Sequence, residues 1–411
     1  MFVAREEVGQ RSETVRRSNL SAIVRALHFR GPLSRSELVA WTGLTRSAIR
    51  SLVGDLVAGE FVVEEAAVRR GTPGRPSPLV RLVADGAVVL ALEIAVDSLA
   101  VAVVGLGGEV FWQRRIERPR GHSTLDEIVG DLADLAAMAR SRRPVDEAPI
   151  GVGVAVAGIV NSTDGVVAFA PNLGWIDVPL GERLAEALDL RVPVGVGNEA
   201  DLGALAEYRR GAAGGADNIL YVHGEVGVGG GIIVDGRSLS GIAGFAGEIG
   251  HMPINPGGRA CHCGSVGCWE TEVGEGALLA RAGYPLDGGG AAVNAVLADA
   301  AAGRSRAIHA LDDVGRWLGI GLAGLVNILN PRLVVLGGLF SRIHPFVGHR
   351  VEEELDRRAL AAPRRLVSVV PAALGVDAPL LGAAEMAFEA LLTDPAAWLG
   401  PRGALVQLAS A

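Results

Sequence analysis

The sequence predicts a small helical domain over residues 1–83, followed by a larger α/β domain with two lobes over residues 84–411. Near residue 86 the hydrophobic pattern changes from short helices to alternating strands and helices. Charge supports the same division. Residues 1–81 hold 13 arginines and 8 acidic residues, a balance of +5, whereas residues 82–411 hold 25 arginines and 38 acidic residues, a balance of −13. A basic module on an acidic body is typical of a nucleic-acid-binding domain attached to a larger one.

The composition is that of a globular protein with sizeable cores. Of the 411 residues, 49% are hydrophobic and 20% are charged, which excludes a disordered or fibrous chain. Seven charged residues among the first 20 leave no room for the apolar segment of a signal peptide. No apolar stretch of about 20 residues, the length of a membrane span, is expected. We therefore expect a cytoplasmic protein.

Three short helices are predicted in the N-terminal domain. Asn19–His28 has apolar residues at helical spacing. Ser34 and Glu37 have the spacing of a capping box, which predicts the start of a second helix. Gly43 predicts the turn that follows, and Thr45 is a good N-cap for a third helix. The buried face of that helix is predicted to contain Ile49, Leu52, Val53, Leu56 and Val57.

A hairpin with a basic tip follows these helices. Phe61–Val63 and Leu79–Leu82 are predicted strands, and residues 69–76 between them are rich in Arg, Gly and Pro. Three helices and such a hairpin predict a winged helix-turn-helix, whose third helix enters the major groove of DNA. The alternative is a helical adaptor or dimerisation module with a basic linker. The residues expected to contact DNA are Thr45, Arg46, Ser47 and Arg50 on the third helix and Arg75 on the wing.

The larger domain is predicted to contain one pattern twice. Strands over Val88–Ile94, Leu99–Gly105 and Val110–Glu117 precede a helix over Thr124–Arg140. Two rounds of strands and strand–helix units predict two α/β lobes with a cleft between them. The remaining predicted strands are Ile150–Val156, Val192–Val196, Asn218–His223, Val228–Val234 and Leu333–Leu336, and the remaining helices are Gly181–Leu188, Ala200–Arg210, 291–302 and 306–329.

All three cysteines of the chain lie within eight residues, at Cys261, Cys263 and Cys268. A disulfide framework would spread cysteines along the chain, whereas clustered thiols in a cytosolic protein indicate a metal. A tetrahedral Zn²⁺ site needs a fourth ligand, and the candidates are His251 and His262. His251 can approach independently, whereas His262 lies between two ligands and is expected to point away. Three unligated thiols in a Gly-rich loop are the alternative.

Two further segments allow both a structural and a functional interpretation. The glycine run 227–231 follows a predicted strand, and it either cradles phosphate with its backbone N–H groups or allows close packing. Asn198 and Glu199 begin a predicted helix. Asn is a favoured N-cap and acidic residues suit the first turn. In a cleft, the same pair can hydrogen-bond sugar hydroxyls.

Together these pieces resemble the ROK family (repressor, open reading frame, kinase), which contains sugar kinases and sugar-responsive transcription regulators on a two-lobed actin/hexokinase-like, ribonuclease H-like fold. The most specific match is the Gly-Glu-Ile-Gly-His segment 247–251 followed by Cys-x-Cys-Gly-x-x-Gly-Cys-x-Glu over 261–270. Supporting matches are residues 170–175, 198–200, 227–231 and 336–338. The resemblance makes His251 the fourth zinc ligand, and it places Asn198, Glu199, Glu248, His251 and Glu270 around a sugar.

The chain departs from the kinases of this family at both phosphate loops. The first loop of the kinases is Asp-x-Gly-Gly-Thr, whereas here Ala95 and Val96 replace its glycines. In the second, Glu225 and Val226 stand before the glycine run, where the kinases have Gly-Thr-Gly. Glu199 replaces the catalytic Asp. Each change adds bulk or negative charge where phosphates would bind.

The resemblance and these departures imply a DNA-binding transcription regulator that responds to a sugar, acts as a repressor and lacks kinase activity. Its partners would be operator DNA and a sugar or sugar derivative. Two-fold symmetric operators favour a homodimer or a higher homo-oligomer. One alternative is an active ATP-dependent sugar kinase with an accessory DNA-binding module. Another is an interaction switch in which the acidic body binds a protein partner.

Overall fold

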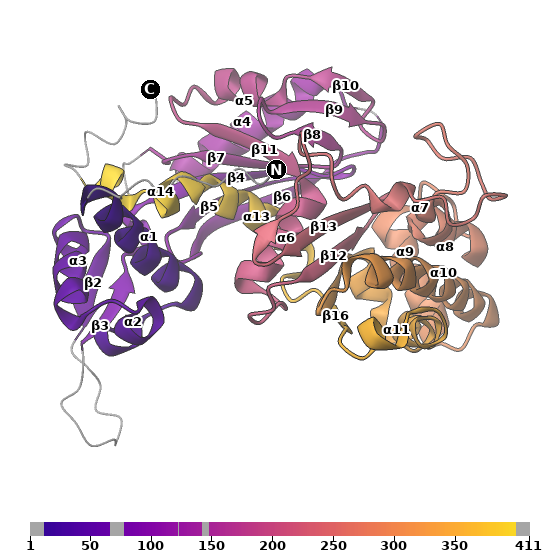
Figure 1. The fold of residues 1–411 in the computed structure, drawn as a ribbon. Helices are drawn as coiled ribbons and strands as arrows, with labels where there is room; N and C mark the ends of the chain where they lie inside the picture. The colour runs from indigo at the N-terminus through magenta and orange to yellow at the C-terminus, as the bar shows by residue number, and fades with distance from the viewer. Residues whose placement is uncertain (1–11, 66–77, 122, 142–147, 400–411) are drawn as a thin grey trace, which may run out of the picture.

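The computed structural model describes residues 12–65, 78–121, 123–141 and 148–399 (Figure 1). A helical N-terminal domain lies against a body of two α/β lobes, each built on a five-stranded sheet. The predicted fold class is therefore found in the described parts. Among the described helices, none has both the length and the apolar character needed to cross a membrane.

The N-terminal domain has the order of elements of a winged helix-turn-helix. Its short strands form an antiparallel sheet in the order β1-β3-β2. Residues 66–77, which contain Arg75 and the predicted basic tip, lie outside the described residues. The elements are α1 (Ser12–Arg30), β1 (Leu33–Ser34), α2 (Arg35–Thr42), α3 (Arg46–Ala58), β2 (Val62–Glu65) and β3 (Leu79–Leu82).

Local signals located the second and third helices correctly. The Ser34 hydroxyl accepts a hydrogen bond from the Glu37 N–H (3.2 Å), and the Glu37 carboxylate accepts one from the Ser34 N–H (2.7 Å), which completes the capping box. Thr45 caps α3 by accepting from the Ala48 N–H (3.2 Å). One prediction was wrong: Val57 is 41% exposed. At 100° per residue it is turned about 90° from the centre of the buried face of α3.

The first helix is longer than predicted, because α1 begins seven residues before Asn19. Its first turns are polar and show no apolar periodicity, so the hydrophobic pattern could not indicate them. Ion pairs hold this part of the helix to other elements. Arg16 pairs with Asp55 of α3 at 2.8 Å, and Arg17 pairs with Asp394 near the C-terminus at 2.9 Å.

The sheet of the first lobe has the order β11-β7-β4-β5-β6. Helices α4 and α5 cover one face, and α13 (Ala378–Ala387) covers the other. A separate three-stranded sheet, which the sequence did not predict, consists of β8 (Ile159–Asn161), β9 (Val166–Ala170) and β10 (Trp175–Val178). The main elements are β4 (Val88–Ile94), β5 (Ser98–Gly105), β6 (Val110–Glu117), α4 (Leu125–Ser141), β7 (Val152–Val156), α5 (Leu180–Leu188) and β11 (Val194–Asn198).

The second lobe has a sheet in the order β14-β13-β12-β15-β16. A cluster of helices forms the largest core on one face, and α6 (Glu199–Arg210) packs on the other. The strands are β12 (Ile219–Gly224), β13 (Val228–Val234), β14 (Arg237–Ser238), β15 (Leu333–Gly338) and β16 (Ser368–Pro371). The helices are α7 (Trp269–Val273), α8 (Glu275–Ala282), α9 (Gly289–Ala301), α10 (Ser305–Leu329), α11 (Leu339–Arg358) and α12 (Ala361–Arg364).

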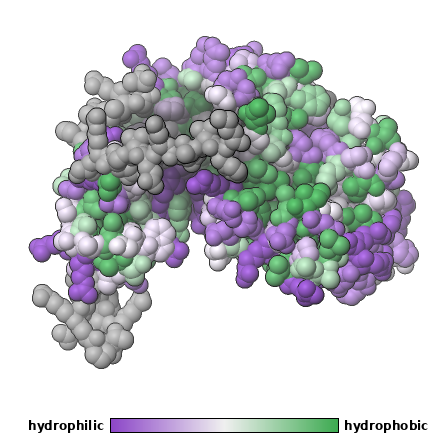
Figure 2. All heavy atoms as spheres, viewed as in Figure 1, coloured by the Kyte–Doolittle hydropathy of each residue, from purple (hydrophilic) through white to green (hydrophobic). Residues whose placement is uncertain are grey.

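The C-terminal helices join the N-terminal domain to the body. The buried side chains of α1, α3 and β3 share one core with α13, α14 (Glu389–Thr393) and one face of β4 and β5. Figure 2 shows a notch between the N-terminal domain and the second lobe. Division of the chain at residues 83 and 84 remains a proposal, because the core of the first domain is completed by helices from the end of the chain.

Helices α6 and α13 approach each other at backbone distance. A Cβ atom at Gly382 of α13 would overlap the carbonyl oxygen of Leu202 in α6. Neither backbone can yield without disturbing its helix. This glycine therefore allows the two helices to pack as one unit.

We predict that Gly382→Ala lowers the free energy of unfolding by about 1–3 kcal/mol or more, because overpacking here displaces backbone. Urea unfolding of the purified chain measures the change. Gly324→Ala in α10 is the matched control, since a Cβ at Gly324 meets nothing within 4 Å. In a helix, that control should stabilise by up to about 1 kcal/mol. Equal stabilities for the two variants would contradict the close packing of α6 on α13.

Candidate functional site

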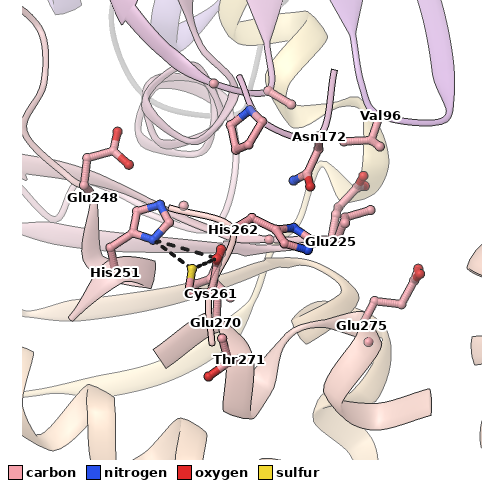
Figure 3. Close-up of a pocket in the computed structure, with 18 of the residues that line it drawn as sticks. Val96, Asn172, Glu225, Glu248, His251, Cys261, His262, Glu270, Thr271 and Glu275 are labelled. Carbon is pink, nitrogen blue, oxygen red and sulfur yellow. Dashed lines mark hydrogen bonds and ion pairs between the residues drawn. The ribbon is translucent and has the colours of Figure 1, made fainter. Parts of the chain in front are cut away.

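A cavity of about 440 Å³ lies between the two lobes. The first lobe contributes the end of β11 to its wall. The second lobe contributes the start of α6, the β12–β13 turn, α7 and α8 (Figure 3). Carboxylate, amide and imidazole groups dominate its polar lining. All five residues predicted to surround a sugar line this cavity: Asn198, Glu199, Glu248, His251 and Glu270.

Asn198 is already engaged in holding the backbone. Its Oδ1 accepts from the N–H groups of Ala200 (2.7 Å) and Asp201 (3.3 Å), which caps α6. Its Nδ2 donates to the carbonyl of Gly158 at 2.8 Å. The structural interpretation of this residue is therefore correct, and these bonds leave its amide little capacity for a ligand.

Glu199, the first residue of α6, lies among other carboxyl groups. Burial raises its pKa well above the usual value, and the neighbouring carboxylates of Glu225, Glu93 and Asp97 raise it further. Burial also raises the pKa of Glu225 to about 7. This environment disfavours the ionised form of the Glu199 carboxyl group.

The segments that correspond to phosphate loops hold carboxylates and bulky side chains. Val96, Glu225 and Val226 line the cavity. Behind them, Arg115 forms a two-pronged ion pair with the buried Glu93, at 2.8 and 3.1 Å. The guanidinium is thus neutralised by Glu93 rather than left free for an anion. The part of the cavity wall that the resemblance assigns to phosphates therefore combines bulky side chains with carboxyl groups.

Arg120 spans the cavity from one lobe to the other. It donates to Asp97 of the first lobe at 2.9 Å and to Glu275 of α8 in the second lobe. Both Arg120 and Glu275 line the cavity. No periodicity or motif in the sequence indicates this pair, because the two residues are 155 positions apart.

Other lining residues were also missed as site residues. Asn172 belongs to a matching segment, but nothing in the sequence singled out its side chain. His262 was examined only as a possible metal ligand. Figure 3 shows these side chains beside the labelled carboxylates. The additional polar residues of the cavity wall are Asn172, Arg120, Arg259, His262, Thr271 and Glu275.

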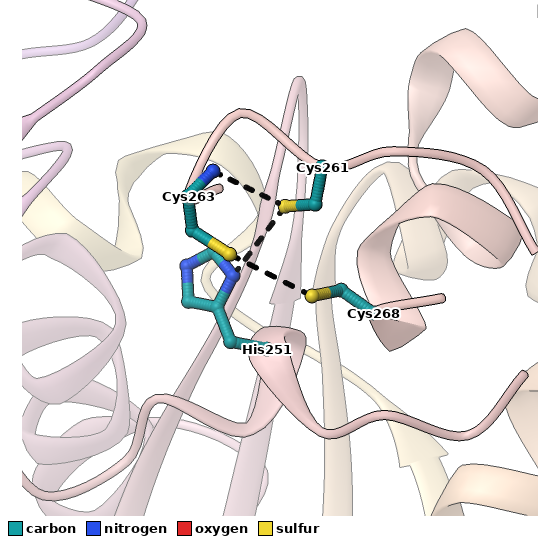
Figure 4. Close-up of side chains that lie close together, drawn as sticks. All are labelled: His251, Cys261, Cys263 and Cys268. Atoms are coloured by element: carbon teal, nitrogen blue, oxygen red, sulfur yellow. Dashed lines mark hydrogen bonds between the residues drawn. The ribbon is translucent and has the colours of Figure 1, made fainter. Parts of the chain in front are cut away.

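Four side chains next to the cavity form a cluster with the chemistry of a metal site. The Nδ1 or Sγ atoms of His251, Cys261, Cys263 and Cys268 all lie within 4.8 Å of one another (Figure 4). The Cys263 and Cys268 sulfurs are 3.7 Å apart, as are the Cys261 sulfur and the His251 Nδ1. Zn–S bonds of about 2.3 Å in a tetrahedron separate ligand atoms by about 3.7 Å. The residues therefore fit a tetrahedral metal, and His262 is not part of the cluster.

Glu270 connects this cluster with the cavity. Its Oε1 accepts a hydrogen bond from the Cys261 thiol at 2.8 Å, and the same oxygen lies 3.8 Å from His251 Nδ1. Because His251 and Glu270 also line the cavity, a change in the cluster reaches the cavity wall directly.

The glycine run serves close packing. Cβ atoms at Gly229 and Gly231 of β13 would collide with Ala200 and Ala204 of α6. The run thus places the first turn of α6, with Glu199, against β13. The structural interpretation of these glycines is the one that the packing supports.

The predicted DNA-contacting side chains at the start of α3 share one exposed surface. Thr45, Arg46, Ser47 and Arg50 are all exposed, whereas Ile49 between them is buried. The hydroxyls of Thr45 and Ser47 lie 3.0 Å apart. Among the described residues, Arg46 and Arg50 form no ion pair, so their guanidinium groups are available to a ligand.

Comparison with known proteins decides the family. The sequence model of the ROK family matches residues 89–390, which is more than half of the chain. The chain belongs to the ROK family. The family model begins after the winged helix-turn-helix, so this domain is an addition to the ROK domain.

Similarity to a ROK repressor extends over nearly the whole chain. The xylose repressor of Bacillus subtilis is 30% identical over 384 residues, which cover 92% of this chain and 97% of the repressor. The crystal structure of a ROK family transcriptional regulator, a homologue of the Escherichia coli Mlc protein, superposes with a TM-score of 0.73 at 25% identity and covers 95% of this chain and 99% of that one. These matches confirm the two-lobed ROK fold.

Similarity to a ROK kinase covers less of the chain. The glucokinase of Streptomyces coelicolor is 30% identical over 317 residues. These residues cover 97% of the kinase but 73% of this chain. The glucokinase thus matches the two-lobed body without the N-terminal domain.

We predict that the free energy of unfolding depends on pH through Asp201, in the first turn of α6. Burial and the charge of Glu248 raise its pKa to about 7. In the unfolded chain the pKa is about 3.9, so between pH 4 and 7 the folded state holds a proton that the unfolded state has lost. The contribution of Asp201 to the free energy of unfolding therefore falls as the pH rises through this window, by up to about 1.4 kcal/mol per pH unit.

Asp201→Asn should remove this slope. Urea unfolding at pH 5, 6, 7 and 8 gives the free energy of unfolding for both proteins. The free energy of unfolding of the variant should increase relative to that of the parent chain as the pH rises. Asp189→Asn, at the exposed end of α5, is the control and should follow the parent curve. Parallel curves for Asp201→Asn and the parent chain would show that Asp201 titrates normally.

Proposed function

We propose that this chain is a DNA-binding transcriptional repressor that responds to a sugar and has no kinase activity. The observation that carries the proposal is the extent of the similarity. The xylose repressor matches the N-terminal domain and the body together, whereas the glucokinase matches the body alone. The cavity supplies the sugar site, and α3 supplies the DNA surface.

The effector is a sugar bound between the lobes. Hydrogen-bonding groups of Glu199, Glu248, His251 and Glu270 surround one cavity, and Asn172 adds an amide. Acceptors and donors in such a ring pair with sugar hydroxyls. Asn198 contributes by capping α6, which positions Glu199.

The absence of kinase activity follows from three features of this cavity. Val96 and Glu225 occupy the surroundings in which phosphates would lie, and burial together with the neighbouring carboxylates raises the pKa of Glu199, which disfavours the ionised form that a general base needs. Glu199 is also one methylene longer than Asp, a displacement of roughly 1 Å that can cost about 10²-fold in rate. Sugar binding tolerates these changes because it needs neither a phosphate cradle nor a base.

The active kinase is the second candidate, and it is supported by the body's similarity to glucokinases. Isothermal calorimetry with D-xylose and D-glucose, without ATP, should detect binding of a sugar. A coupled assay for ADP should show no sugar-dependent ATP turnover. Robust ATP-dependent phosphorylation that disappears in Glu199→Ala would establish the kinase instead.

The metal of the cluster is one structural Zn²⁺, held by His251, Cys261, Cys263 and Cys268. Zinc with four protein ligands supplies structural stability rather than Lewis-acid catalysis. His251 belongs to both the cluster and the cavity wall, so the zinc fixes the orientation of a sugar-contacting ring.

Elemental analysis should find one zinc per chain, and Cys263→Ser should lose it. The variant should also melt at a lower temperature and bind sugar more weakly, because the segments that carry His251 and Glu270 are no longer held by the zinc. His262→Gln is the matched control. It changes a cavity residue between two of the cysteines and should retain the zinc. Full zinc content in Cys263→Ser, or its loss in His262→Gln, would refute this ligand set.

Operator DNA binds along the exposed start of α3. Arg46 and Arg50 form no ion pair within the described part of the chain, and their guanidinium groups can bind the edge of guanine with two hydrogen bonds. Thr45 and Ser47 lie on the same surface, and Arg75 of the wing would contact the backbone or the minor groove. A homodimer would present two such surfaces to a two-fold operator. A protein that binds chromosomal operators acts in the cytoplasm.

Arg50→Ala should weaken binding to a duplex enriched from random sequences by the full chain. The expected loss is about 1–3 kcal/mol, together with a relaxed base preference at one position of each half-site. Electrophoretic mobility shifts over a panel of single-base variants measure both effects. Arg191→Ala, an equal loss of charge on the body, is the control. Unchanged base preference in Arg50→Ala would exclude its contact with a base.

A further inference from the structure

Helix α6 extends from the sugar cavity to the N-terminal domain. Its first residue, Glu199, lines the cavity. Its last two residues, Arg209 and Arg210, contact Glu385 of α13, and Arg210 also contacts His28 of α1. At 1.5 Å per residue, its 12 residues span about 18 Å. One element of secondary structure thus touches both the proposed effector site and the domain that would bind DNA.

The C-terminal end of α6 is fixed to the N-terminal domain by a buried polar network. Glu385 of α13 is 2% exposed, and it accepts hydrogen bonds from Arg209 (3.3 Å) and Arg210. His28 of α1, which is 1% exposed, lies with its Nε2 3.2 Å from the same carboxylate. Arg210 also donates to the carbonyl of Gly107 at 2.7 Å. The two arginines, the carboxylate and the histidine come from three separate segments of the chain.

Both ring nitrogens of His28 are held in this network. The Gly107 N–H donates to His28 Nδ1 at 3.0 Å, and Nε2 lies 3.2 Å from the Glu385 carboxylate and 2.6 Å from the Arg210 guanidinium. Burial lowers the pKa of His28, which keeps the ring neutral at neutral pH. Burial alone would raise the pKa of Glu385, but the hydrogen bond from His28 and the charges of Arg210 and Arg209 hold it at about 2.

Further contacts connect the same helix ends. Arg209 donates to Glu389 of α14 at 2.8 Å, and Arg25 of α1 pairs with the same carboxylate. The Arg209 guanidinium also lies over the ring of Phe29, 4.9 Å from its centroid. Removing one partner of a buried ion pair leaves the other charge uncompensated and is strongly destabilising, so the contacts favour motion of the connected elements together.

The other end and the side of α6 are equally constrained. The glycines of β13 hold its first turn against the second-lobe sheet, and Gly382 holds α13 against its middle. Because α13 also carries Glu385, a rotation of α6 moves both partners of His28. The N-terminal domain can follow α6 and α13 as a unit, whereas neither helix can slide past the other.

We propose that α6 and α13 relay occupancy of the sugar cavity to the winged helix-turn-helix, with Arg209, Arg210 and Glu385 as the positioning residues that hold His28 of α1. This inference depends on the proposed function. A sugar that hydrogen-bonds Glu199 and closes the lobes would shift the first turn of α6. The shift reaches α1 through the buried network and changes the orientation of α3 toward DNA.

The test measures coupling rather than affinity alone. The sugar probe is D-xylose or D-glucose, whichever binds in calorimetry, and the DNA probe is the duplex enriched by the full chain. The coupling factor is the ratio of DNA dissociation constants with and without saturating sugar. For the parent chain we expect about tenfold, and DNA should change the sugar affinity by the same factor.

Arg210→Met keeps the stem of the side chain and removes its donors. It should bind the sugar within twofold of the parent chain, while its coupling factor falls below threefold. Arg210→Lys is a second variant that preserves the charge; its single ammonium cannot maintain the fork of contacts to Glu385 and Gly107, so its coupling factor should be intermediate. Arg17→Gln is the matched control, because Arg17 joins α1 to Asp394 without contacting α6. It should keep the parental coupling factor.

Each result has a distinct meaning. An unchanged coupling factor in folded Arg210→Met or Arg210→Lys would overturn the relay and leave the proposed function intact. An equal loss in Arg17→Gln would also overturn it, because any weakened contact between the domains would then have the same effect. A parental coupling factor of one with both sugars would overturn the proposed function, and the relay with it.

Discussion

The close packing of α6 is the constraint on which the rest of the structure depends. Alanine side chains of this helix meet glycines of β13, and its backbone meets Gly382 of α13. Such contacts are short and leave no space for a helix to adjust by itself. The first turn of α6 therefore has a defined position in the cavity wall, and its last turn has a defined position beneath the N-terminal domain. The proposed sugar site and the contact with the N-terminal domain lie at the two ends of the same helix.

The cavity combines carboxyl groups that lie close together with a cluster that fits a metal. Glu199 lies near Glu225, Glu93 and Asp97, and burial raises its pKa. In the proposed function, this arrangement favours hydrogen bonding to a sugar and opposes phosphoryl transfer. His251 and Glu270 border both the cluster and the cavity, so the proposed zinc would hold this part of the cavity wall in place. Arg120 adds ion pairs that connect the two lobes.

Local features of the chain were predictable from the sequence, and contacts between distant segments were not. The capping box of Ser34 and Glu37 and the cap at Thr45 depend on residues three positions apart, and both were found. The cysteine spacing and the motif that ends at His251 indicated the candidate metal cluster. The periodicity of apolar residues indicated most of the long helices and strands. In contrast, the strands of the small sheet β8–β10 are too short to show a pattern. His28 and Glu385 are 357 positions apart, and only the folded chain brings them together.

The central claim is that sugar in the cavity alters the N-terminal domain through α6, and hydrogen–deuterium exchange of the unmodified chain tests it most directly. Exchange would be compared with and without saturating D-xylose or D-glucose, whichever binds. The account predicts altered protection in peptides from α6, over residues 199–210, with a parallel change in α1, over residues 20–30. Peptides from α10 in the second-lobe core should remain unchanged. Protection that changes around the cavity and in α6 while α1 stays the same would contradict the account.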